Sequence, residues 1–65
     1  MKLKKLDFDK YVIYDEVGYP FGTVENKNFK TVFKFNIAIS KDKLIELLNE
    51  LNKQTTMYIY DIVFE

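Results

Sequence analysis

Four residue types are missing from this chain of 65 residues: it contains no His, no Cys, no Trp and no Arg, and Ser40 is its only serine. Without imidazole and thiol groups it cannot build the usual zinc sites, a Cys–His pair or a Ser–His–Asp triad. All ten of its basic residues are Lys, so the bidentate guanidinium contacts that read phosphate or guanine are absent as well. We therefore expect a protein that is not an enzyme and that holds no cofactor.

Acidic residues are the remaining candidates for a metal site. Asp7 and Asp9 share one strand face, and Asp15 and Glu16 follow in a turn, which together resemble an oxygen-ligand set for calcium or magnesium. No glycine-containing loop wraps these carboxylates as a calcium loop does. We interpret them as solvated strand and turn residues and expect no metal.

Long apolar runs and an excess of charge of one sign are missing too. No apolar stretch approaches the roughly 20 residues of a membrane-spanning helix, and the Lys-rich start leads into Asp7 and Asp9 instead of a signal-peptide segment. Ten basic and ten acidic residues give net charge zero, so no long-range field draws the chain to nucleic acid or a membrane surface. We expect a cytoplasmic protein, and the Lys, Asn, Ile, Phe and Tyr bias favours a phage or mobile-element origin.

Aromatic and aliphatic residues, in contrast, are plentiful, with 48% of the chain hydrophobic and 17% aromatic. A domain of this length buries roughly 60% of the surface that its unfolded chain exposes, so its stability is marginal without help. Disulfides are excluded, and self-association is the aid that remains. We expect residues 1–65 to form one small domain that assembles as a homodimer.

Residues 40–53 have the clearest periodicity. Four leucines recur at the i, i+3, i+4 and i+7 positions of one helix face: Leu44, Leu47, Leu48 and Leu51. Ser40 is a favourable N-cap, and Ile39 with Leu44 occupies the positions of a hydrophobic staple. The pattern predicts one amphipathic helix.

Alternation with period two marks the strands. Residues 29–39 place Phe33, Phe35, Ile37 and Ile39 on one face, and residues 57–64 place Tyr58, Tyr60, Ile62 and Phe64 on the face that we assign to the core. Two further strands are predicted from the shared parity of Leu6, Phe8, Val12 and Tyr14 and of Tyr19, Phe21 and Thr23, with turns at 15–18 and 25–28 and Pro20 at a strand start. The predicted fold is α+β: a four-stranded antiparallel sheet in β-β-β-α-β order, with the helix packed on one face.

One helix covers only one face of such a sheet, so the other face is open to solvent or to a partner. The residues that we place on the open face and predict to bind protein are Tyr11, Ile13, Val32, Ile59, Asp61 and Val63. The five tyrosines of the chain are candidate anchors, because Tyr is enriched at interfaces. We predict a small non-catalytic protein-binding module that acts through this face or a strand edge, of the kind that phages and mobile elements use as accessory or inhibitor proteins.

An alternative prediction is single-stranded nucleic acid binding. Lys27, Lys30 and Lys34 interleave with phenylalanines, and the N-terminal lysines Lys2, Lys4 and Lys5 could extend a groove. Alternation sends the lysines and the phenylalanines to largely opposite faces, whereas stacking on bases needs both side by side. With zero net charge, we prefer the protein-binding prediction.

Overall fold

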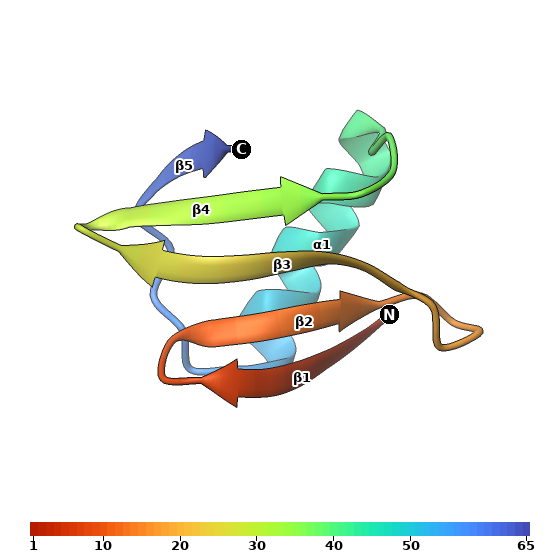
Figure 1. The fold of residues 1–65 in the computed structure, drawn as a ribbon, viewed down its shortest axis with the longest axis horizontal. Coiled ribbons are helices and arrows are strands. Elements are labelled where there is room, and N and C mark those ends of the chain that lie inside the picture. Colours follow the sequence, from red (N-terminus) through yellow and green to blue (C-terminus); the bar gives the residue numbers. More distant parts are fainter.

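The computed structural model describes all of residues 1–65 and contains five strands and one helix (Figure 1). The elements in chain order are β1 (Lys2–Asp7), β2 (Lys10–Tyr14), β3 (Pro20–Lys27), β4 (Lys30–Phe35), α1 (Lys41–Gln54) and β5 (Asp61–Phe64). The α+β class is confirmed. The predicted number of strands is wrong, because the sheet has five instead of four.

The additional strand comes from a hairpin near the N-terminus. We predicted one strand through Leu6 and Tyr14, but the chain reverses at Phe8 and Asp9, where Asp9 has a φ of 51° and the Asp7 carboxylate accepts a hydrogen bond from the Phe8 N–H at 2.8 Å. Neither Gly, Pro nor Asn marks this turn, and apolar alternation continues through it. A period-two pattern therefore could not separate β1 from β2.

The sheet order follows the chain order, β1-β2-β3-β4-β5. The first four strands are antiparallel, whereas β5 runs parallel to β4 with Val32 opposite Val63, which corrects the fully antiparallel prediction. Helix α1 and the following segment carry the chain back to the end of the sheet at which β4 begins (Figure 1). A strand that starts there must run parallel to β4, as in any strand–helix–strand crossover.

The core lies between α1 and one face of the sheet. Ile13, Val24 and Phe33 from the strands meet Leu47 and Leu51 from the helix, and all five side chains are fully buried. Phe21 and Met57 complete this cluster.

Helix α1 begins and ends within one residue of the prediction. The Ser40 Oγ accepts a hydrogen bond from the Lys43 N–H at 3.1 Å, which confirms Ser40 as the N-cap. The staple residues Ile39 and Leu44 both pack against the core. The helix is neither long nor apolar enough to cross a membrane.

Candidate protein-binding surface

Half of the predicted binding residues lie on the wrong face for the prediction. Tyr11 and Ile13 of β2 pair with Val24 and Gly22 of β3, and both side chains point toward the helix. Ile13 is fully buried there, and Tyr11 packs against the core. Ile59 precedes β5 and also packs against the core. Both faces of β2 carry apolar residues, so alternation alone did not show which face α1 covers.

The other predicted residues do share the open face. Val32 pairs with Val63, and Asp61 pairs with Lys30, on the side of the sheet opposite α1. Val32 is itself buried, so it offers little to a partner. The strand registers place six lysines on the same face: Lys2, Lys4, Lys10, Lys27, Lys30 and Lys34. The open face is therefore mainly a solvated basic surface, and the large exposed apolar side chains lie elsewhere.

The most exposed apolar residues of the C-terminal segment are those that we assigned to the core. Their exposed fractions are 70% for Tyr58, 37% for Tyr60, 39% for Ile62 and 55% for Phe64. Within β5, the Phe64 ring stacks on the core residue Phe33 with centroids 5.8 Å apart but stays 55% exposed, whereas Met57 belongs to the core and Ile59 packs against it. Helix α1 packs over β2, β3 and β4. It does not cover the edge strand β5, so the side chains of β5 on the helix side of the sheet stay exposed.

Two of these residues form an aromatic cluster with the β3–β4 turn. The Phe29 and Tyr60 rings meet edge to face with centroids 5.8 Å apart, and Tyr58 and Tyr60 are 5.1 Å apart. Phe29 is 81% exposed. We call Phe29, Tyr58 and Tyr60 the aromatic cluster. The β1–β2 turn, which carries the equally exposed Phe8, lies at the same end of the sheet (Figure 1).

The turn that presents Phe29 has an unfavourable backbone for this residue. Lys27 pairs with Lys30, and both residues between them have positive φ, 52° at Asn28 and 59° at Phe29. Such two-residue turns favour Asn-Gly, because glycine adopts positive φ without a steric penalty. A phenylalanine in this conformation costs roughly 1–2 kcal/mol.

A polar anchor fixes the backbone of Tyr58 and Tyr60 against the end of the sheet. The buried Thr31 hydroxyl accepts a hydrogen bond from the Tyr60 N–H at 2.8 Å and donates one to the Asn26 Oδ1 at 2.8 Å. The Asn26 Nδ2 in turn donates to the Tyr58 carbonyl oxygen at 2.7 Å, and the Asn26 N–H donates to the Asp9 carbonyl at 3.0 Å. These hydrogen bonds connect the β1–β2 turn, the β3–β4 hairpin and the C-terminal segment at one end of the sheet.

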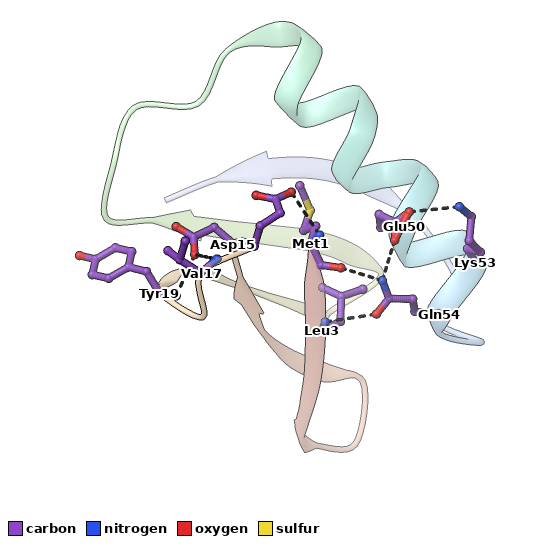
Figure 2. A network of polar contacts seen from close by, with 9 residues as sticks. Met1, Leu3, Asp15, Val17, Tyr19, Glu50, Lys53 and Gln54 are labelled. Atoms are coloured by element: carbon purple, nitrogen blue, oxygen red, sulfur yellow. Dashed lines mark hydrogen bonds and ion pairs between the residues drawn. The ribbon is translucent and has the colours of Figure 1, made fainter.

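A second polar network covers the opposite edge of the sheet, at β1 (Figure 2). The Gln54 Oε1 accepts a hydrogen bond from the Leu3 N–H at 3.2 Å, and its Nε2 donates to the Met1 carbonyl at 3.0 Å and to the Glu50 Oε1 at 2.6 Å. The Lys53 ammonium lies 3.3 Å from the same Glu50 carboxylate. Hydrogen bonds from Gln54, and then from Lys53, lower the pKa of Glu50 from its usual value. The side chain of Gln54 thus acts as a peptide group of a neighbouring strand would.

The acidic residues considered as metal ligands serve local structure. The Asp15 Oδ1 accepts hydrogen bonds from the Val17 N–H at 3.1 Å and the Tyr19 N–H at 2.8 Å, which closes the β2–β3 turn (Figure 2). The Asp9 Oδ2 accepts a hydrogen bond from the Asn26 Nδ2 at 3.4 Å. No three His, Cys, Asp or Glu side chains gather closely enough to hold a metal ion.

The strand lysines of the nucleic-acid alternative, Lys27, Lys30 and Lys34, share the open face of the β3–β4 hairpin, because Lys27 pairs with Lys30. Lys30 and Lys34 lie on the open face, whereas Phe33 and Phe35 face the helix. At the β3–β4 turn, lysines are neighbours of an exposed aromatic residue in the hairpin, because Lys27 and Lys30 flank the Asn28–Phe29 turn.

No family model, curated protein or solved structure matches this chain. We therefore infer its function from the aromatic cluster, its anchor and the two edges of the sheet.

Proposed function

We propose that this chain is a small, non-catalytic protein-binding module that contacts its partner with the aromatic cluster. The observation that carries the proposal is that the largely exposed rings of Phe29 and Tyr58 both meet the partly exposed Tyr60 ring at one end of the sheet. Aromatic residues dominate the energetics of protein interfaces, with Tyr prominent among them. An accessory or inhibitor role of phage or mobile-element type is the form of this proposal that the composition favours.

Phe29 supports the proposal because its backbone conformation lowers the stability of the free protein. A glycine at this position would relieve the strained backbone, and the exposed Phe29 ring gains little burial in return. The ring meets the Tyr60 ring edge to face. A side chain that destabilises its own turn and projects into solvent is best explained by a contact with another molecule.

The anchor supports the proposal through preorganisation. The Tyr60 N–H donates to the Thr31 hydroxyl and the Asn26 amide donates to the Tyr58 carbonyl, so the backbone of both tyrosines is already fixed in the free protein. Binding therefore loses less conformational entropy than it would for a flexible segment. Two phenolic hydroxyls at the rim of the cluster can donate or accept hydrogen bonds with a partner's surface.

Single-stranded nucleic acid is the second candidate, because Lys27 and Lys30 flank Phe29. A base could stack on Phe29 while the ammonium groups contact phosphates. The carboxylates of Asp9 and Asp61 at the same end oppose the approach of a polyanion, and the chain has zero net charge. We therefore place this candidate second.

Phe29→Gly is the decisive variant, because it removes the ring and improves the turn. We expect it to raise the free energy of unfolding by about 1 kcal/mol and to weaken partner binding at least tenfold. The matched control is Val17→Ala, which shortens an exposed apolar side chain in the β2–β3 turn, away from the cluster. Immobilised wild type and both variants are compared for proteins retained from a cell extract, and the affinity of each retained protein is then measured in solution.

A partner that binds wild type and Val17→Ala equally, and Phe29→Gly weakly, supports the proposal. Weak binding by Phe29→Gly cannot be due to unfolding, because this variant is expected to be more stable than wild type. Equal binding to all three forms contradicts the proposal, because the Phe29 ring would then contribute nothing to the contact. A labelled single-stranded oligonucleotide is titrated with up to about 100 μM protein at low salt, the range of non-specific binding. Binding that Lys30→Glu and Phe29→Gly both abolish would replace the protein-binding proposal with the nucleic-acid one.

A further inference from the structure

The two edges of the sheet differ in how their backbone groups are satisfied. At the β1 edge, Gln54 occupies the Leu3 N–H and the Met1 carbonyl, and the strand carries Lys2, Lys4 and Lys5 (Figure 2). Lysines and side-chain coverage are the devices by which proteins prevent an edge strand from pairing with another chain. In Figure 1 no other strand lies beyond β5, and no side-chain hydrogen bond reaches the backbone of Ile62 or Phe64.

The free backbone groups of β5 can be identified from the ladder. The Glu65 N–H donates to the Phe33 carbonyl at 2.9 Å and so points toward β4. Because successive residues of a strand direct these groups to alternate sides, Val63 points toward β4 as well, whereas Ile62 and Phe64 direct their N–H and C=O groups away from the sheet. The β5 edge therefore offers two residues that are ready for a strand ladder.

The side chains of the same residues are apolar. Ile62 and Phe64 are opposite Thr31 and Phe33 in the parallel register and so lie on the helix side, where both stay substantially exposed. Strand β5 contains neither lysine nor proline, and Asp61 is its one charged residue. An apolar, unguarded edge of this kind pairs with another strand unless something covers it.

We propose that the edge is covered by a second copy of this chain, with the two β5 strands antiparallel about a two-fold axis at Ile62. This edge does not include the Phe29 ring, on which the test of the proposed function rests, although Tyr60 belongs to both the aromatic cluster and the edge. A two-fold axis perpendicular to the sheet joins the two edges antiparallel and keeps both helices on one side, so the helix-side residues of one copy meet those of the other. The dimer would contain one continuous sheet of both copies.

Charge selects the register. In a register centred on Val63, Asp61 of each copy lies directly opposite Glu65 of the other, and such like-charge pairs are destabilising. Centring on Ile62 shifts the strands by one residue in each copy and removes both repulsions. Ile62 then meets Ile62 of the second copy in a hydrogen-bonded pair, and Phe64 meets Tyr60. Each copy provides Tyr60 to pair with Phe64 of the other copy, so the edge is self-complementary.

The contact is small, which sets the conditions of the test. Phe and Tyr side chains have on the order of 150–250 Å² each to bury, and about half or less of that is exposed at Tyr60 and Phe64. The dimer therefore buries less than the roughly 1,600 Å² of a standard interface. We expect dissociation constants on the order of 10–100 μM.

Sedimentation velocity between about 2 and 500 μM brackets this range. We expect wild type to dimerise and Ile62→Lys to weaken association at least tenfold, because it places two ammonium groups opposite one another at the axis. The matched control is Leu6→Lys, an equivalent change at an exposed position of β1, which should leave the dimer intact. Phe29→Gly should also leave it intact, which separates this test from that of the proposed function.

Amide hydrogen exchange of the wild type tests the same edge without any substitution. The Ile62 and Phe64 amides should exchange at least tenfold more slowly at 500 μM than at 2 μM, concentrations that bracket the expected affinity. The Val63 amide points toward β4 in either state and is the internal control, with the same protection at both concentrations.

Single cysteines test the register, because the chain has no cysteine of its own. Opposite residues of a hydrogen-bonded antiparallel pair have Cα atoms about 5.5 Å apart, within the range of a disulfide. Oxidation should therefore cross-link Ile62→Cys faster than Val63→Cys or Leu6→Cys. Faster cross-linking of Val63→Cys would overturn the register.

A monomer at the highest concentration, a dimer that Ile62→Lys leaves unchanged, or concentration-independent exchange at Ile62 would each overturn the proposal. A monomer that still binds a partner through Phe29 would overturn self-association alone and leave the proposed function standing.

Discussion

Replacing Thr31 by Val removes one hydroxyl group from the polar anchor and leaves the shape of the side chain almost unchanged. Thr31 is fully buried, and its Oγ1 donates to the Asn26 Oδ1 and accepts from the Tyr60 N–H, both at 2.8 Å. No cavity forms, because valine has nearly the same volume. The change in stability therefore reports the loss of the two hydrogen bonds alone. The substitution leaves the Tyr60 N–H and the Asn26 Oδ1 without the Thr31 hydroxyl as a partner.

The expected loss follows from the number of bonds. Each lost hydrogen bond contributes about 1 kcal/mol, so Thr31→Val should lower the free energy of unfolding by about 2 kcal/mol. In a domain of this size 1 kcal/mol corresponds to roughly 4–8 °C in Tm, so the melting temperature should fall by about 8–16 °C. Far-UV circular dichroism in thermal and urea titrations measures both quantities.

Thr23→Val is the matched control, because Thr23 lies on the open face of β3 and its hydroxyl makes no hydrogen bond within the chain. We expect its free energy of unfolding to change by about 0.5 kcal/mol or less. The Tyr60 amide should also exchange faster in Thr31→Val than in wild type. Equal stability of the two valine variants, or an unchanged Tyr60 amide, would refute the anchor as the device that holds the C-terminal segment.

Three further predictions concern the core, the sheet and the β1 edge. Leu47→Ala truncates a fully buried helix residue and should lower the free energy of unfolding by about 2–5 kcal/mol in urea titrations. Gly22→Ala places a Cβ 2.7 Å from the Phe35 Cδ1, and we expect a loss of about 1–3 kcal/mol in the same titration. The pKa of Glu50 lies below its usual value of 4.5, because the Gln54 side chain, and then a neighbouring ammonium, donate to its carboxylate. This contribution is complete above pH 4.5 and disappears as the pH falls through the lower folded-state pKa, so Glu50→Gln should show a smaller loss of stability than wild type on acidification.

The parts of the fold that depend on local rules could be predicted from the sequence. Helix α1 follows from four leucines at helical spacing and from Ser40, whose side chain can satisfy only a nearby backbone N–H. Pro20 begins β3, as expected for a residue that cannot donate to a ladder. The β1–β2 turn could not be predicted in this way, because it contains none of the usual turn residues except aspartate and alternation continues across it.

The candidate site was largely missed because face assignments in an apolar chain are ambiguous. Both faces of β2 and of residues 57–64 are rich in apolar residues, so period two showed which residues share a face but not which face is covered. Tyr58 and Tyr60 were expected in the core and are exposed, whereas Ile13 was expected outside and is buried. The one signal for the aromatic cluster was Phe29 after Asn28, where a turn favours glycine.

By itself, the sequence determined the α+β class, the position of the helix and its cap, and the lack of imidazole, thiol and guanidinium groups. These properties depend on residue identity and on spacing within one segment, and a linear pattern contains both. Only the tertiary structure decided that β5 runs parallel to β4 at an open edge, that Gln54 covers the other edge, and that Asn26 and Thr31 hold Tyr58 and Tyr60 at the surface. Each of these depends on a contact between residues distant in the chain, and the path of α1 across the sheet brings those residues together.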